Sequence, residues 1–148
     1  NCMSVIRVFT DGACSGNPGN GGWGVVIIRD TKIFKHNGSE NDTTNNRMEL
    51  KAAIEGIKLA ADESKLMLYT DSKYVKDGIT SWIENWKKNN WLTSSKKPVK
   101  NQDLWEQLDT LNERYNVSWK WVKGHQIEET EDSRYNNLAD ELARNAVK

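Results

Sequence analysis

The chain has 148 residues, of which 36% are hydrophobic and 28% charged, a balance typical of one soluble globular domain spanning 1–148. Its 21 basic and 21 acidic side chains cancel, so an argument for a nucleic-acid partner must rest on where the charges lie. No apolar run approaches the ~20 residues of a membrane span, and no export signal is recognised at the N-terminus. Two cysteines are too few for a disulfide scaffold, so a cytoplasmic location is expected.

The first forty residues are predicted to form two hairpins. Residues 4–11 are rich in β-branched and aromatic side chains and are predicted to form a strand. Residues 23–29 and, more weakly, 33–37 are the next two strands. The glycine-rich segment 16–22, between the first and second of these strands, lacks the Gly-Lys-Ser/Thr ending of a phosphate-binding loop, and we interpret it as a hairpin turn.

Helical periodicity then alternates with short strands. After cap candidates at 43–46, the first helix is marked by Leu50, Ile54 and Ile57. Residues 66–70 and 117–122 are predicted strands. The other helices are marked by Val75, Ile79, Trp82 and Trp86, by Leu104, Leu108 and Leu111, and at the C-terminus by either Leu138, Leu142 and Ala146 or Ala139 and Ala143. This order predicts an α/β fold, with helices packed on a mixed sheet.

Four carboxylates are placed at the ends of predicted elements. Asp11 follows the first strand and Asp71 follows the strand 66–70, so the two meet if these strands are parallel neighbours. Glu49 lies near the start of the first long helix and Asp140 near the start of the last. Each has an ordinary alternative, because acidic residues in a first helical turn favour the macrodipole and Asp71 could be part of a helix cap.

A cluster of such carboxylates indicates a metal site. Three or four acidic groups crowded together repel one another unless a cation lies between them. Hard oxygen ligands without cysteine select Mg²⁺ or Mn²⁺ over zinc. Two such ions about 3.5–4 Å apart can activate a water and stabilise the leaving oxygen of a phosphodiester.

Five blocks of the sequence resemble the type 1 ribonucleases H, and most closely the bacterial enzymes. They are FTDGACSGNPGNGGWG at 9–24, TTNNRMELKAAI at 43–54, YTDSKYV at 69–75, WVKGH at 121–125 and NNLADELA at 136–143. WIENWKKNNW and SKKPVKNQDLW resemble the basic, Trp-rich protrusion of the bacterial enzymes, at about 76–102. The resemblance implies a ribonuclease H-like fold: a five-stranded mixed sheet, three antiparallel strands first and then parallel additions, flanked by helices.

The resemblance also implies the chemistry, which is hydrolysis of the RNA strand of RNA–DNA hybrids with two Mg²⁺ ions, Mn²⁺ being an alternative. Asp11 would bridge both ions, and Asp140 would hold the ion that activates water. Glu49 and Asp71 would hold the ion near the leaving 3′-oxygen, and the products would carry 5′-phosphate and 3′-hydroxyl ends. His125 would assist proton transfer or product release.

Charge position supports a nucleic-acid partner. The segment 73–100 has seven lysines and two acidic residues, a net +5 in a neutral chain: Lys73, Lys76, Lys87, Lys88, Lys96, Lys97 and Lys100 against Asp77 and Glu84. Trp82, Trp86 and Trp91 are interleaved with the lysines, a pattern suited to a phosphate backbone and its sugars. The alternative is that the tryptophans are ordinary helix core and the lysines its solvated face.

The family pattern also assigns contacts with the hybrid. Asn17, Asn45 and Asn46 match its groove-reading positions, with Cys14 alongside, and Thr44 matches a DNA-phosphate contact. An amide can both donate to and accept from the 2′-hydroxyl that distinguishes RNA.

Two features depart from the family pattern. Lys73 stands where bacterial relatives usually carry Gln, and it can donate but not accept a hydrogen bond. The segment 126–139 is longer than usual and acidic; it is either a solvated loop or an element that alters metal affinity or repels phosphate. It separates Asp140 from the other blocks and leaves Glu141 as a weaker substitute.

Two other functions remain as alternatives to the leading interpretation, a monomeric hybrid endonuclease. A catalytically silent hybrid-binding module would have no need of four acids beside a polyanion. An integrase- or transposase-like nuclease of the same fold would not be expected to carry both the asparagines and the Lys/Trp protrusion.

Overall fold

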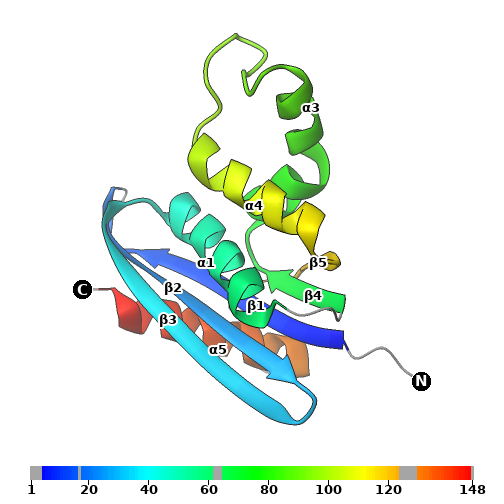
Figure 1. The fold of residues 1–148 in the computed structure, drawn as a ribbon. Helices are drawn as coiled ribbons and strands as arrows, with labels where there is room; N and C mark the ends of the chain where they lie inside the picture. Colours follow the sequence, from blue (N-terminus) through cyan, green and yellow to red (C-terminus); the bar gives the residue numbers. More distant parts are fainter. Residues whose placement is uncertain (1–4, 17, 62–64, 124–129, 148) are drawn as a thin grey trace.

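A five-stranded mixed sheet forms the centre of the computed structural model, which describes residues 5–16, 18–61, 65–123 and 130–147 (Figure 1). The strands are β1 (Val5–Cys14), β2 (Gly19–Arg29), β3 (Lys32–Thr43), β4 (Lys65–Thr70) and β5 (Val117–Trp121). Their order is β3-β2-β1-β4-β5. β1 to β3 pair antiparallel, and β4 is parallel to both β1 and β5. The predicted sheet is confirmed.

Helices cover both faces of this sheet (Figure 1). They are α1 (Asn45–Ala60), α2 (Lys73–Asp77), the π-helical segment η1 (Gly78–Trp82), α3 (Ile83–Lys88), α4 (Gln102–Arg114) and α5 (Glu131–Ala146). α1 and α4 lie over one face and α5 over the other. Side chains alternate along a strand, so β1 gives Ile6 and Val8 to the first face and Phe9 to the second.

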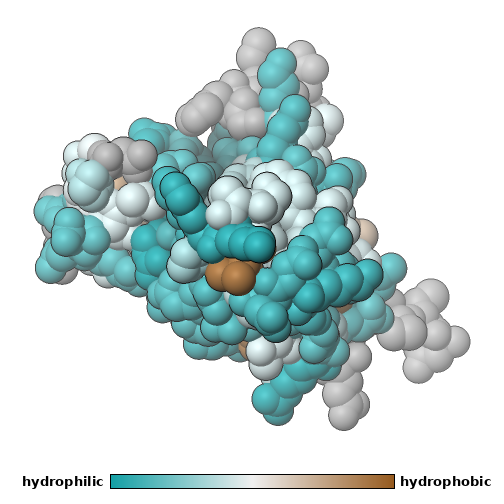
Figure 2. Space-filling view, turned by 90° about the horizontal axis from the view of Figure 1, so that it is seen from above, coloured by the Kyte–Doolittle hydropathy of each residue, from teal (hydrophilic) through white to brown (hydrophobic). Residues whose placement is uncertain are grey.

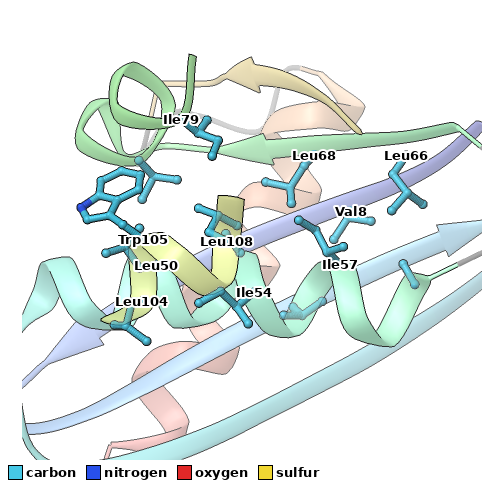
Figure 3. Packing of buried hydrophobic residues seen from close by; sticks show 14 of the residues in the cluster. Val8, Leu50, Ile54, Ile57, Leu66, Leu68, Ile79, Leu104, Trp105 and Leu108 are labelled. Atoms are coloured by element: carbon cyan, nitrogen blue, oxygen red, sulfur yellow. The ribbon is translucent and has the colours of Figure 1, made fainter. Parts of the chain in front are cut away.

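The main core forms between α1, α4 and the sheet (Figure 3). The predicted apolar positions Leu50, Ile54 and Ile57 are all fully buried, and burying each such side chain contributes about 1.5–3 kcal/mol. On the other face, the rings of Phe9 and Tyr69 stack with their centroids 4.2 Å apart. The two cores fix α1 and α5 on opposite sides of β1.

The first hairpins are longer than the sequence pattern indicated. β1 continues to Cys14, so Asp11 lies inside the strand and not after it. β2 begins at Gly19 and pairs Gly21 with Cys14, which reduces the predicted turn to a short one. β3 extends to Thr43, although most of its side chains are exposed. Backbone pairing, to which glycine and polar residues contribute fully, carries the ladder beyond the apolar stretches.

A π-helical turn changes which side chain of the Trp-rich helix is buried. Val75 and Ile79 are buried as predicted, but Trp82 is 39% exposed and Ile83 is buried instead. η1 spans Gly78–Trp82, and its wider turn shifts the buried face by one residue.

The last helix starts earlier than predicted. Thr130 caps it, and Thr130 and Ser133 form a reciprocal capping box, so α5 begins at Glu131. Asp140 therefore lies in the second half of α5 and not near its start, and residues 131–139 of the predicted acidic loop are helical. The sequence analysis offered two sets of residues for the buried face of this helix, and of these Ala139 and Ala143 are the ones that are fully buried.

No helix in the described residues is long and apolar enough to cross a membrane. The face in Figure 2 is mostly hydrophilic, with a small hydrophobic patch at its centre.

Candidate metal centre

Asp11 and Asp71 are brought together by parallel strand pairing. Thr10 of β1 is the register partner of Thr70 of β4, so Asp11 is next to Asp71, which directly follows β4. The backbone N–H of Ser72 donates to Thr70 Oγ1 at 3.1 Å, and this bond holds the turn at Asp71. The sequence analysis expected these two carboxylates to meet if their strands were parallel neighbours, and β1 and β4 meet that condition.

Glu49 reaches the same place because α1 passes very close to β1. A Cβ on Gly12 would lie 2.5 Å from both the backbone nitrogen of Glu49 and the carbonyl carbon of Met48. Only glycine allows this approach without displacing the helix. The N-cap Thr44, whose hydroxyl accepts from the backbone N–H of Arg47 at 3.2 Å, sets where α1 begins.

Asp140 approaches from the opposite face, on α5. A Cβ on Gly24 would overlap the carbonyl oxygen of Ala139 and lie 2.7 Å from the backbone nitrogen of Ala143. This close packing of α5 on β2 brings Asp140 near Asp11, whose pKa the Asp140 carboxyl helps to raise. Glu141 is exposed and lines a separate surface depression with Arg134, so the structure favours Asp140 over Glu141.

The ligand atoms of Asp11, Glu49 and Asp71 all lie within 4.8 Å of one another. Asp11 and Glu49 are only 2% and 6% exposed. Burial, and then the charges of Glu49 and Asp71, raise the pKa of Asp11 to about 12. Burial, and then Asp71, likewise raise the pKa of Glu49 well above its usual value. Without a cation, the folded chain therefore retains protons at this cluster at neutral pH.

One oxygen of each of these three carboxylates has no hydrogen-bond partner among the described residues: Asp11 Oδ2, Glu49 Oε1 and Asp71 Oδ1. Asp11 Oδ1 accepts from the backbone N–H of Gly12 at 2.9 Å. Buried oxygens left without a partner are costly, and a divalent cation among them would satisfy all three. An oxygen-only donor set suits a hard cation such as Mg²⁺ or Mn²⁺.

The fourth carboxylate has a cationic partner that sequence reasoning missed. Arg144 Nε donates to Asp140 Oδ2 at 2.9 Å. The i,i+4 spacing of the two residues on one helix was the signal that could have revealed it.

The acidic residues at the start of α5 are part of an ion-pair network with the sheet. Arg7 of β1 pairs with Glu131 and, at 3.5 Å, with Asp132, and Lys120 of β5 contacts Asp132 at 3.3 Å. Through these ion pairs, Glu131 and Asp132 hold the start of α5 against β1 and β5. The other two acids of the predicted loop, at positions 128 and 129, lie outside the described residues.

The residues predicted to read the hybrid are distributed around the start of α1. Thr44 is the helix cap, Asn45 and Asn46 are exposed on the first turn, and the Cys14 thiol donates to the carbonyl of Thr43 at 3.4 Å. Asn17 and His125 lie outside the described residues.

The three predicted tryptophans are not equivalent. Trp82 is exposed, whereas Trp86 and Trp91 are half-buried and pack against the main core. Trp86 meets the fully buried Trp105 edge-on, with ring centroids 5.3 Å apart. Trp86 and Trp91 are thus partly core residues, as the alternative interpretation of this stripe expected.

The lysines of this region also differ. Lys87 bonds to Asp109 and Glu113 of α4 at 3.2 and 2.7 Å, and these contacts raise its pKa. Lys87 therefore joins α3 to α4. The other four lysines of the protrusion that are predicted to contact the nucleic acid are exposed: Lys88, Lys96, Lys97 and Lys100.

Lys73, the departure from the family pattern, lies over an aromatic ring beside the carboxylates. Its Nζ is 4.9 Å from the ring centroid of Trp121. The Trp121 indole N–H donates to the backbone carbonyl of Asp71 at 3.0 Å. Lys73 thus packs on the ring that supports the Asp71 turn.

Comparison with known proteins agrees with this geometry. The family model described as RNase H matches residues 3–148. Ribonuclease H of Hydrogenovibrio crunogenus is 52% identical over 98% of this chain and 97% of its own length, and that of Erythrobacter litoralis is 51% identical over 95% and 97%. The solved structure of LC9-RNase H1, described as a type 1 RNase H with the type 2 active-site motif, superposes with a TM-score of 0.78 at 29% identity, covering 99% of this chain and 74% of that one. The chain belongs to the ribonuclease H family and is a ribonuclease H enzyme.

Proposed function

We propose that this protein is an endonuclease that hydrolyses the RNA strand of RNA–DNA hybrids, using two Mg²⁺ ions held by Asp11, Glu49, Asp71 and Asp140. The observation that carries the proposal is the set formed by two buried carboxylates, Asp11 and Glu49, and the half-buried Asp71, whose ligand oxygens lie within 4.8 Å of one another. Each of the three has an oxygen that lacks a partner in the described residues. A role in folding alone does not account for it, because the cluster raises the pKa of two of its own members.

The four carboxylates have different positions and therefore different proposed roles. Asp11 interacts with Glu49 and Asp71 on one side and with Asp140 on the other, so it would help to hold both ions. Glu49 and Asp71 complete the first position, and Asp140 completes the second from the other face of the sheet. When bound, the two ions supply activation of the attacking water and stabilisation of the leaving 3′-oxygen. Cleavage of the P–O3′ bond leaves a 5′-phosphate and a 3′-hydroxyl.

We assign substrate contacts to the exposed residues around this centre. The side chains of Asn45 and Asn46 lie on the first turn of α1, where amide groups and the helix N-terminus can contact the sugar–phosphate backbone. On the protrusion, Lys88 and Lys96 line a hollow of about 380 Å³ together with short polar side chains such as Thr93. Exposed Trp82 offers a ring for stacking against sugars or bases.

Lys87 is left out of this contact set because α4 already neutralises it. With the exposed aromatic surface assigned to substrate, we expect residues 1–148 to act as a single-domain monomer.

Cleavage assays with matched variants test the proposal. The wild type should cut the RNA of a labelled hybrid in Mg²⁺ but not in chelator, and should leave double-stranded DNA and double-stranded RNA intact. Asp71→Asn should abolish cleavage while it retains hybrid binding. Asp140→Asn should lower the rate strongly, whereas Glu141→Gln, which removes the adjacent charge, should not.

Three outcomes would contradict the proposal. Binding without cleavage by the wild type would identify a silent module, and cleavage of duplex DNA would point to an integrase-like activity. Cleavage retained by Asp71→Asn would refute the metal assignment.

A further inference from the structure

Arg144 gives Asp140 a different environment from that of the other carboxylates. Its Nε donates to Asp140 Oδ2 at 2.9 Å, and the side chains are 63% and 15% exposed. In the described part of the chain, no cation contacts Asp11, Glu49 or Asp71 through an ion pair. The guanidinium therefore satisfies the one carboxylate that lies outside the three-acid cluster.

This pair places a positive charge directly on the carboxylate that the second metal position would use. A cation between Asp11 and Asp140 requires a free lone pair on Asp140 and the removal of a positive charge from its immediate surroundings. The guanidinium of Arg144 stays charged at every working pH. Its competition with the divalent ion for Asp140 therefore does not depend on protonation of the arginine. Arg144 is mostly exposed and its i,i+4 bond is weak, which allows a divalent ion to displace it.

We propose that Arg144 is a positioning residue that selectively lowers the affinity of the Asp11–Asp140 position for its divalent ion. The first position, formed by Asp11, Glu49 and Asp71, is little changed because Arg144 contacts none of these residues. The two ions would then bind with separate affinities, and Arg144 would set the difference. The inference rests on the two-ion function proposed above.

Titration of the metal-free protein with Mn²⁺, without nucleic acid, measures this directly by calorimetry or by the electron paramagnetic resonance of free Mn²⁺. Arg144→Gln should tighten the second dissociation constant about three- to tenfold, since a charge near a divalent ion in water contributes on this scale. The first constant should change less than the second, because Arg144 contacts Asp140 and none of Asp11, Glu49 and Asp71, and the energy between two charges falls with their distance. The gain in affinity at the second position that Arg144→Gln brings should become smaller as salt is added.

Two further variants separate the contact from general electrostatics. Arg144→Lys keeps the charge and the spacing and should return the second constant to near the wild-type value. Arg134→Gln removes the same charge from an exposed position on the same helix and should leave both constants as in the wild type. Circular dichroism of each variant checks that α5 is intact.

The outcomes distinguish this inference from the function on which it rests. If Arg144→Gln leaves the second constant unchanged or weakens it, Arg144 does not compete with the ion and the inference is wrong, while the two-ion proposal stands. If the wild type binds no Mn²⁺, or binds it equally well as Asp11→Asn, the two-ion proposal itself fails.

Discussion

The carboxylate cluster should make the metal-free protein less stable than a variant that lacks one of its charges. Asp11 is 2% exposed, and its pKa is raised to about 12. Asp11→Asn keeps the size of the side chain and an oxygen that can accept from the Gly12 N–H, but it removes the charge. The metal-free variant should therefore unfold less readily than the wild type at neutral pH.

The magnitude follows from proton linkage. In the unfolded chain Asp11 titrates near its usual pKa of about 3.9, whereas in the folded chain its carboxyl keeps a proton far above that pH. The free energy of unfolding therefore falls as pH rises above about 4, by about 1.4 kcal/mol per pH unit for one proton. Over the three units to pH 7 the upper limit is about 4 kcal/mol, and sharing of protons within the cluster lowers the expected gain of Asp11→Asn to about 2–4 kcal/mol.

Urea unfolding in the presence of a chelator, at several pH values between 4.5 and 8, provides the measurement. The gain of Asp11→Asn should be small at pH 4.5 and should grow with pH. Asp30→Asn is the matched control, since Asp30 is exposed in a turn at φ 58°, a conformation that asparagine tolerates. Added Mg²⁺ should narrow the difference, because an ion that binds the folded wild type stabilises it.

Two results would refute this reasoning. One is equal stability of Asp11→Asn and the wild type at pH 7 in chelator. The other is a gain that is the same at pH 4.5 and pH 8, which would indicate a packing effect independent of charge.

Three further predictions concern the packing of α5, the cap of α5 and the substrate contacts of the protrusion. Gly24→Ala should lower the free energy of unfolding by about 1–3 kcal/mol and reduce the cleavage rate in the same sample, because the new methyl group pushes against Ala139 of α5; a fully active, equally stable variant would contradict the packing argument. Thr130→Ala should cost about 1 kcal/mol in urea unfolding, since it removes the cap of α5, and no loss would mean that the cap contributes nothing. Lys88→Ala should weaken hybrid binding and reduce the slope of log K against log salt by about 1, whereas Lys87→Ala should mainly lower the melting temperature; an equal change of slope in both variants would place Lys87 on the substrate.

The sequence by itself determined the parts of the site that depend on local pattern. A short apolar strand followed by Asp71, and a capped helix carrying Glu49, are local features. The sequence left open whether the strands bearing Asp11 and Asp71 are parallel neighbours, and the strand pairing of β1 with β4 decided it. The apolar spacing of α1 likewise predicted its buried face, because the period of a helix alone decides which residues point inward.

Only the tertiary structure decided the features that depend on contacts between distant elements. The start of α5 is held by Arg7 and Lys120 from two strands, as well as by its own cap. That capped start places Asp140 in the helix's second half and Arg144 one turn beyond it. The exposure of Trp82 results from the π-helical turn in η1. Periodicity assumes a regular helix and one buried face, so it could not show where a turn widens or which cation lies beside a carboxylate.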